Sequence, residues 1–328
     1  MSLAVLGAGS FGTAVANHAA RKGHEVVLWC RTDEQARYIN EHRRNPRYLK
    51  DCPLVESLRA TSDLEEALGS ADRTVLALPT QSLRGFLERL APLSTEGHSF
   101  LSLAKGIEIA TGLMPRAIFE EVLPGRPYSA LSGPSHAEEV VRELPTAVIV
   151  ASADPSEALG WQTELNSPRF RVYTSGDVTG AELGGAVKNI IAIAVGIAHS
   201  LSAGDNARAA LATRGLAEIM RLGAAMGASP LTLAGLAGVG DLMATCYSQH
   251  SRNFRFGAAI GRGASPEAAA AEIGQVVEGA HTTRALVAYA RRAGIELPIS
   301  EGVHAILYEG AALQDVIDGL LFRDPKPE

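Results

Sequence analysis

The chain has 328 residues, of which 46% are hydrophobic and 20% are charged, and its formal net charge at pH 7 is -6. This length and composition predict a globular protein of two domains, with little disorder outside the C-terminal tail. The acidic balance argues against nucleic acid as a partner, because proteins that bind its phosphate backbone carry a clustered positive excess.

The cysteines and the N-terminus indicate a cytoplasmic protein. Cys30, Cys52 and Cys246 lie far apart, with no CxxC pair and no histidine at ligand spacing, so we expect neither a metal site nor a disulfide framework. The opening MSLAVLGAGS lacks the basic segment and the long apolar region of a signal peptide. The apolar run at residues 190–198 is about half of the ~20 residues that a membrane span needs, so no span is expected.

The first half of the chain alternates strand-like runs with helical patterns, such as those at residues 12–22 and 83–90. Several of the runs lack an alternation of polar and apolar residues, which is typical of strands covered on both faces by helices. We therefore predict the α/β class, with a Rossmann-type doubly wound sheet in a dinucleotide-binding domain of residues 1–176. The predicted strands are LAVLG, HEVVLW, RTVLALP, HSFLSLA, YSALSG, TAVIVAS and FRVY.

A GxGxxG motif follows the first predicted strand and opens a helix. Gly7 would allow a tight turn, Gly9 would let the backbone approach a pyrophosphate, and Gly12 would let the helix pack closely. The helix start, with Ser10 and Phe11 at the contact, would offer free N–H groups to the phosphates. We expect a dinucleotide cofactor here; the alternative is a glycine turn with a structural role only.

The end of the second predicted strand bears on the choice of cofactor. Arg31 stands where an acidic residue would bind the ribose of NAD, and an arginine there accommodates a 2′-phosphate. The sequence therefore favours NADP over NAD without excluding NAD, and the nearby Asp33 weakens the preference. The basic stretch RRNPRYLK at residues 43–50 could extend a phosphate site on the adenine side, but a solvated loop is the favoured interpretation.

After about residue 176, strand-like runs vanish, and alanine, glycine and leucine recur at helical spacing. This pattern predicts an all-α domain at residues 177–328 that supplies substrate binding and catalysis. The polar, proline-containing tail at residues 323–328 is expected to fray. Helices are predicted at residues 178–201, 206–226, 230–234, 242–247, 253–260, 266–273, 279–293, 300–308 and 312–320.

Two stretches of the first half carry candidate substrate contacts. Lys105 follows a predicted strand, at the edge where open α/β sheets bind ligands, and Gly106 beside it would permit close approach of a ligand. Gly133 and Ser135 lie at the same edge, and Ser135 is a candidate N-cap for a helix that starts at His136.

The second half adds a candidate phosphate site. Ser251, Arg252 and Asn253 lie at a predicted helix start, where hydroxyl, guanidinium and free N–H groups could hold a small phosphate. Asp241 follows a GVG turn at residues 238–240, which we expect to be flexible. We interpret Asp241 as a helix cap that also orients a lysine, with capping alone as the alternative.

That lysine is Lys188, in the apolar helix ELGGAVKNIIAI. Gly184 and Gly185 precede it by one turn and Ala192 follows by one turn, so a ligand or another backbone segment has space to approach. Desolvation would bring its pKa towards the working range of a general acid or base. Since burial of a lysine is costly without a role or a partner, Lys188 is the candidate catalytic residue.

Eight stretches follow one another along the chain in this order: GAGSFGTA, AKGIE, SGPSHAEE, ELGGAVKNIIAIAVGI, NARAALATRGLAE, GLAGVGDLMATC, SRNFRFG and IGQVVEG. Together they resemble the bacterial NAD(P)-dependent glycerol-3-phosphate dehydrogenase family over nearly the whole chain. The KN, RGL, GD and SRN motifs are more specific than the glycine turn, because other Rossmann dehydrogenases do not share them in this order. The resemblance implies reduction of dihydroxyacetone phosphate for glycerophospholipid synthesis, and a homodimer.

The resemblance also implies roles for individual residues, with Lys188 as general acid/base and Asn189 and Thr245 as second-rank substrate contacts. Ala104 departs from the family pattern, because many relatives have threonine or serine there, and it puts a hydroxyl contact in doubt. The implied substrate contacts are Lys105, Gly133, Ser135, Lys188, Asp241, Ser251, Arg252 and Asn253. The implied cofactor contacts, besides the three motif glycines, are Ser10, Phe11, Arg31, Lys105, Ala137, Arg252, Val276 and Glu278.

Two other functions stay open from the sequence. One is a Rossmann dehydrogenase that acts on a sugar acid or hydroxyacid. The other is a non-catalytic nucleotide sensor, which explains poorly why a lysine lies in an apolar helix. A histidine as acid/base is not favoured, because no histidine lies in a motif with supporting spacing; those considered are His136, His199, His250, His281 and His304.

Overall fold

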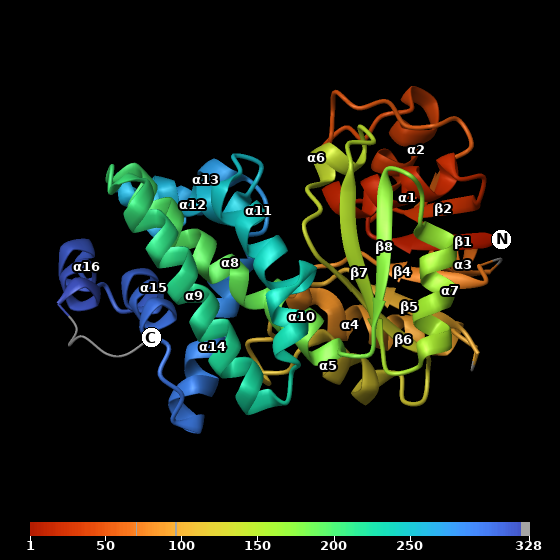
Figure 1. Cartoon of the computed structure of the whole chain (residues 1–328). Helices are drawn as coiled ribbons and strands as arrows, with labels where there is room; N and C mark the ends of the chain where they lie inside the picture. The colour runs from red at the N-terminus through yellow and green to blue at the C-terminus, as the bar shows by residue number, and fades with distance from the viewer. Residues whose placement is uncertain (70, 96, 323–328) are drawn as a thin grey trace.

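The computed structural model consists of a half that contains a sheet, followed by a helical half, and it describes residues 1–69, 71–95 and 97–322 (Figure 1). The two halves meet where α8 (Val178–Ser200) and the π-helical segment η2 (Leu236–Gly240) pack against strands β6 (Tyr128–Ser132) and β7 (Thr146–Ser152) of the sheet. The predicted fraying of residues 323–328 lies outside the described residues.

The sheet has eight strands in the order β3-β2-β1-β4-β5-β6-β7-β8, and every neighbouring pair is parallel except β6 and β7. The chain reverses its direction of winding between β1 and β4, which opens a crevice at the carboxyl ends of these strands. The predicted doubly wound sheet is thus confirmed. The strands are β1 (Ser2–Leu6), β2 (Glu25–Trp29), β3 (Arg59–Thr61), β4 (Arg73–Leu76), β5 (Ser99–Ser102), β6 (Tyr128–Ser132), β7 (Thr146–Ser152) and β8 (Phe170–Ser175).

All seven predicted strands are present, and β3 was missed because three residues are too short for a periodic signal. Along β1, Leu3 and Val5 join one apolar core while Ala4 and Leu6 join another, so helices cover both faces of the sheet. The helices of this half are α1 (Ser10–Arg21), α2 (Asp33–His42), α3 (Leu64–Leu68), α4 (Thr80–Leu90), the 3-10 turn η1 (Ala91–Leu93), α5 (Pro115–Val122), α6 (Ala137–Val140) and α7 (Pro155–Leu165).

The helical half is all-α, as predicted, and α8 runs through its centre (Figure 1). The expectation of a flexible turn at residues 238–240 is wrong, because these residues belong to η2. Gly238 packs so tightly there that a Cβ atom would lie 1.8 Å from the carbonyl oxygen of Leu233. Besides α8 and η2, this half contains α9 (Gly204–Met226), α10 (Pro230–Ala234), α11 (Asp241–Tyr247), α12 (Arg252–Gly261), α13 (Pro266–Ile273), α14 (Glu278–Ala293), α15 (Pro298–Tyr308) and α16 (Leu313–Leu321).

Helix α8 is long and apolar enough to cross a membrane, yet 94% of its most apolar window is buried inside the protein, which is typical of a core helix. Small residues let its neighbours approach closely. A Cβ atom on Gly196 would lie 2.1 Å from the carbonyl oxygen of Phe254, and one on Gly257 would lie 2.0 Å from that of Ile193. Close contact with α12 therefore holds α8 in place.

Candidate active site

The glycine turn after β1 has the shape that a dinucleotide requires. Gly7 has a φ of +124°, and a Cβ atom on it would lie 2.4 Å from the carbonyl oxygen of Ala77. A Cβ atom on Gly12 would lie 2.0 Å from the carbonyl oxygen of Gly7, whereas one on Gly9 would meet no atom within 4 Å. Two glycines therefore close the turn, and the third leaves the open space that a diphosphate would fill.

The start of α1 borders that space. No side chain caps this helix, so the amide groups at Ser10 and Phe11 face the turn without a side-chain partner. Ala137, the first residue of α6, is buried in the apolar core that also contains α1, and α6 packs against α1. The structure thus brings Ala137 close to the helix that follows the glycine turn.

Arg31 lies just beyond β2, at the same edge of the sheet. Its side chain is exposed, and no partner for it is found in the described part of the chain. The carboxylate of Asp33 accepts a hydrogen bond from the hydroxyl of Ser62, so Asp33 is occupied by a neighbouring segment. This arrangement leaves a free guanidinium for a 2′-phosphate, which supports the predicted preference for NADP.

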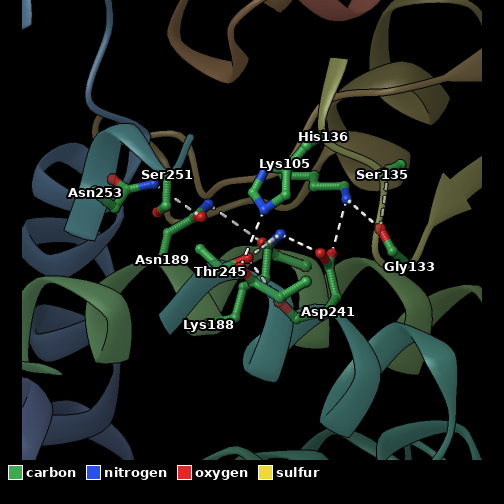
Figure 2. A network of polar contacts seen from close by, with 12 residues as sticks. Lys105, Gly133, Ser135, His136, Lys188, Asn189, Asp241, Thr245, Ser251 and Asn253 are labelled. Atoms are coloured by element: carbon green, nitrogen blue, oxygen red, sulfur yellow. Dashed lines mark hydrogen bonds and ion pairs between the residues drawn. The ribbon is translucent and has the colours of Figure 1, made fainter. Parts of the chain in front are cut away.

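The lysines of both halves meet on one carboxylate (Figure 2). Lys188 is buried in α8, and its Nζ donates to Asp241 Oδ1 and, at 2.8 Å, to Thr245 Oγ1. The Nζ of Lys105 donates to Asp241 Oδ2 at 2.8 Å and to the carbonyl oxygen of Gly133 at 3.3 Å. One carboxylate from α11 therefore joins a strand end of the sheet half to the core helix of the other half.

Burial and charge act in opposite directions in this cluster. Burial lowers the pKa of Lys188 to about 8, Asp241 opposes that change, and the charge of Lys105 adds to it. Burial alone would raise the pKa of Asp241, but the two ammonium groups outweigh burial and hold that pKa below its usual range. Two cations thus share one anion, which leaves a positive charge suited to a phosphate substrate or a developing oxyanion.

The packing around Lys188 differs in part from expectation. The space in front of Gly184 is filled by η2, since a Cβ atom there would lie 2.3 Å from the carbonyl oxygen of Ala237. Gly185 instead lies under Lys105, with its Cβ position 3.3 Å from Cδ. Gly184 therefore admits another backbone segment, which is one of the two predicted occupants, and Gly185 accommodates the side chain of Lys105.

The predicted cap at Asp241 is also wrong, because Gly240 occupies the N-cap position of α11 and Asp241 is the first helical residue. Its carboxylate is directed to the two lysines instead. The contact with Lys188, which was the other part of that expectation, is present. The hydroxyl of Thr245, one turn later, donates to the backbone oxygen of Asp241 at 2.6 Å and leaves its lone pairs for Lys188.

A second polar pair lies beside the lysine cluster. Asn253 Nδ2 donates to Asn189 Oδ1 at 2.9 Å, and Asn253 Oδ1 accepts from the backbone N–H of Gly279 at 2.9 Å. Ser251 is the N-cap of α12 and accepts from the N–H of Phe254 at 3.1 Å, which confirms the predicted helix start. The side chain next to Lys188 is thereby joined to the start of α12.

Ser135 does not cap a helix, contrary to expectation. Its hydroxyl donates to the carbonyl oxygen of Gly133 at 2.9 Å, and α6 begins at Ala137 with His136 as an N-cap that makes no side-chain bond. The ring Nε2 of His136 lies 3.0 Å from the carbonyl oxygen of Ala244 in α11, so this histidine connects the two halves. The hydroxyl of Ser135 is therefore used in a hydrogen bond to the sheet half and does not cap α6.

Ala104, the departure from the family pattern, is buried in the apolar core on the α4 face of the sheet. Its methyl group packs there and offers no hydroxyl to the site. The next residues are held between helices, because a Cβ atom on Gly106 would lie 2.8 Å from both Glu278 Oε2 and Thr80 Oγ1. Gly106 thus admits side chains of α14 and α4, whereas the sequence suggested a ligand.

Glu278 and Arg252 lie together near these residues. Burial raises the pKa of Glu278 to about 7, with Arg252 opposing the change, and Glu278 Oε2 has no hydrogen-bond partner among the described residues. Arg252 Nη1 donates to the carbonyl oxygen of Val276 at 3.1 Å. The structure therefore brings together the three implied cofactor contacts of the helical half.

The basic loop at residues 43–50 contains a residue whose placement the sequence did not reveal. Arg44, Arg47 and Lys50 are exposed, as expected of a solvated loop, but Asn45 is fully buried and contacts Ala8 in the glycine turn. Neither composition nor spacing signals this contact, because it depends on how the loop folds back.

The cysteines and the acidic groups form no metal centre within the described ranges, where no group of three or more His, Cys, Asp or Glu side chains could hold an ion. Cys30, Cys52 and Cys246 are free and buried. Burial raises the pKa of Cys30 and of Cys246 to about 12, which leaves both as unreactive thiols.

Comparison with known proteins gives matches along nearly the whole chain. The family model for the NAD-dependent glycerol-3-phosphate dehydrogenase N-terminus matches residues 2–158, and that for the C-terminus matches residues 177–318. An NAD(P)+ glycerol-3-phosphate dehydrogenase of Halorhodospira halophila is 48% identical over 328 residues, covering 100% of this chain and 98% of the relative. One from Chlorobium limicola is 45% identical over 331 residues, covering 100% and 99%.

A solved structure agrees with these relatives. The crystal structure of glycerol-3-phosphate dehydrogenase from Coxiella burnetii superposes with a TM-score of 0.95 at 39% identity. The match covers 98% of this chain and 99% of that one, so the similarity includes both halves.

Proposed function

The chain belongs to the NAD-dependent glycerol-3-phosphate dehydrogenase family, and we propose that Lys188 transfers the proton of the family's reaction in this member. The enzyme is an NAD(P)-dependent oxidoreductase that reduces dihydroxyacetone phosphate to sn-glycerol 3-phosphate, a product for glycerophospholipid synthesis. The observation that carries the assignment is the pairing of a buried Lys188, with a pKa of about 8, with Asp241. Such a pKa suits a group that gains and loses a proton near neutral pH.

The cofactor is NADP, with NAD as an alternative, and this chain's residues fit it. The open space at Gly9 and the uncapped start of α1 would receive the diphosphate, and the free Arg31 would receive a 2′-phosphate. The family resemblance assigns Ala137, Arg252, Val276 and Glu278 to the same cofactor, and the contact of Arg252 with the carbonyl oxygen of Val276 supports a common role for these two. When bound there, NADPH would supply the hydride for the C2 carbonyl carbon of the substrate.

The substrate phosphate belongs at the start of α12, where Ser251, Arg252 and Asn253 lie. A helix start offers N–H groups and the positive end of its dipole, and the guanidinium of Arg252 adds a charge-assisted donor. Asn253 contacts Asn189, the neighbour of Lys188 in α8, so a three-carbon substrate bound there would reach the amine with its carbonyl oxygen. Gly133 and Ser135 would border the substrate at the sheet edge.

Lys188 acts as an ammonium group in the reductive direction. As hydride adds to C2, the C=O double bond becomes a single bond, and the oxygen takes a proton from Nζ, which gives the alcohol and a neutral amine. The amine then regains a proton from solvent. Asp241 favours the charged form of Lys188, and Lys105 supplies a second positive charge near the developing oxyanion.

The decisive experiment follows absorbance at the nicotinamide band with dihydroxyacetone phosphate as substrate, with NADPH and NADH in parallel. We expect oxidation of NADPH, and slower oxidation of NADH. Turnover of a 2-keto acid without turnover of dihydroxyacetone phosphate would establish a hydroxyacid dehydrogenase instead. Binding of NADPH without oxidation of it by either substrate would establish a nucleotide sensor.

We also propose that the domain boundary lies between residues 176 and 177. The segment that joins β8, which ends at Ser175, to α8, which starts at Val178, supports this limit, as does the gap between the two family matches. Limited proteolysis of the folded protein should give a first cut near this segment or leave both halves intact. Early cuts within α8 would argue for another boundary.

A homodimer in the cytoplasm completes the proposal. Exposed apolar side chains on the helical half, Leu231 at 84% and Met243 at 57% exposure, support a contact with a second copy. Three free cysteines support a reducing compartment. Light scattering of the purified protein should give twice the chain mass, and cell fractionation should place the protein with the cytoplasmic enzymes.

A further inference from the structure

Asn45 links the loop after α2 to the glycine turn. Its side chain is 0% exposed, and its Nδ2 donates to the carbonyl oxygen of Ala8 at 3.0 Å and to Thr13 Oγ1 at 2.8 Å. Ala8 lies between two glycines of the motif, and Thr13 lies in the first turns of α1. Both hydrogens of the amide are therefore used on the two elements that would surround a diphosphate.

The other end of the same amide organises its own loop. Asn45 Oδ1 accepts from the backbone N–H groups of Arg47 at 3.2 Å and of Tyr48 at 3.1 Å. Gln35 Nε2, in α2, donates both to this oxygen at 3.3 Å and to the carbonyl oxygen of Ala8 at 3.1 Å. All donors and acceptors of the Asn45 side chain thus have partners, which fixes its orientation.

The contact with Ala8 determines which way a neighbouring N–H points. The carbonyl of Ala8 and the N–H of Gly9 belong to one planar trans peptide unit, so they point in opposite directions. Because Asn45 and Gln35 hold the carbonyl on the side of α2, the N–H of Gly9 points to the other side. Gly9 is the motif glycine with no atom near its Cβ position, so space for a ligand is open at that residue.

We propose that Asn45 is a positioning residue for the dinucleotide, which orients the Ala8–Gly9 peptide so that the N–H of Gly9 can donate to the diphosphate. This inference rests on the proposed function, since it requires that the glycine turn bind a dinucleotide. The diphosphate is common to NADPH and NADH, so the effect of Asn45 should be equal for both. Arg31, by contrast, should act on the 2′-phosphate of NADPH only.

The test is Asn45→Asp, which keeps an acceptor for Arg47 and Tyr48 but places an oxygen opposite the carbonyl of Ala8. The dissociation constants of NADPH and NADH, measured by fluorescence titration, should both rise by about tenfold, or ~1.4 kcal/mol. The KM for dihydroxyacetone phosphate should change by less than about twofold, because that substrate does not contact the turn.

Asn40→Asp is the matched control. The amide of Asn40 also bridges backbone groups of the sheet half, donating to the oxygen of Ala60 at 2.8 Å and accepting from its N–H at 2.9 Å, without touching the turn. A similar loss of Tm with unchanged cofactor affinity in this variant, beside weaker binding in Asn45→Asp, separates positioning from general stability.

Thr13→Val serves if Asn45→Asp fails to fold. It removes one acceptor of the Asn45 amide, and both dissociation constants should rise by about two- to threefold. Unchanged binding of both cofactors in the variant that folds would overturn the inference, as would weaker binding of NADPH alone. If the unmodified protein bound neither dinucleotide, the proposed function would fail instead.

Discussion

The glycine turn and the lysine cluster, the two parts of the proposed site, are built in different ways. The turn is a single segment of six residues that offers backbone groups, and its shape follows from three glycines close together in sequence. The cluster joins Lys105, Lys188 and Asp241; Lys105 lies 136 positions before Asp241 in the sequence, and Lys188 lies 53 positions before it. The difference teaches that affinity for the cofactor and reactivity of the amine have separate structural origins.

Lys188→Met is expected to separate catalysis from cofactor affinity by the largest factor. The substitution removes the proton donor but keeps the length of the side chain. The kcat should fall by about 10²–10⁴-fold, the usual contribution of a general acid or base, while the dissociation constant of NADPH stays within about twofold. Stopped-flow absorbance and fluorescence titration measure the two quantities. Lys22→Met, just after α1 and away from the cluster, is the control, and activity above about 1% in Lys188→Met would exclude this lysine as the acid.

Gly9→Ala tests the role of the glycine turn in cofactor affinity. The added methyl group meets no protein atom within 4 Å, so the protein should fold with an unchanged Tm, but it occupies the space for the diphosphate. The dissociation constants of both cofactors should rise by about 10²-fold, or ~2.7 kcal/mol. Gly85→Ala in α4, where the Cβ position is equally open, should leave affinity unchanged. Normal NADPH binding by Gly9→Ala would contradict the role of the turn.

Asp241→Asn addresses what sets the proton affinity of the amine. Asp241 raises the pKa of Lys188 towards its value of about 8, so its removal should lower that pKa further. Reduction requires the ammonium form, so activity falls as pH rises through this pKa. In the variant the fall should begin about one pH unit lower, with about tenfold less activity at pH 9. A pH–rate profile measures this.

The control for that profile is Glu182→Gln. Glu182 is a buried carboxylate on the same helix, but its partners are the hydroxyl of Tyr128 at 2.5 Å and the backbone N–H of Arg116 at 2.9 Å. The pH at which activity begins to fall should therefore stay unchanged in this variant. If that pH fell equally in Asp241→Asn and Glu182→Gln, general packing of α8, and not Asp241, would set the pKa of Lys188.

The smallest effect is expected from Arg31→Ala, because the residue is exposed and, in the proposed site, would contact only the 2′-phosphate. The ratio of kcat/KM for NADPH over NADH should fall by about fivefold, with NADH unaffected. Parallel steady-state assays measure the ratio. An equal fall in kcat/KM for both cofactors would show that Arg31 supports the glycine turn and does not bind the 2′-phosphate.

Local sequence determined much of this protein. The strands, the helices and the glycine turn follow from apolar periodicity and from the spacing of Gly7, Gly9 and Gly12, which act over a few residues each. The ordered motifs also established the resemblance to the family. Lys188 was singled out because an apolar helix with a lysine is costly unless the lysine has a partner or a role.

Only the tertiary structure decided which partners those residues meet. Asp241 lies between two lysines, η2 fills the space in front of Gly184, and Asn45 is buried against Ala8. In each case the partner comes from a distant segment, and the direction of the side chain depends on the packing of that segment. Periodicity reports on which face of an element a residue lies, but it does not report on what the fold places opposite that face.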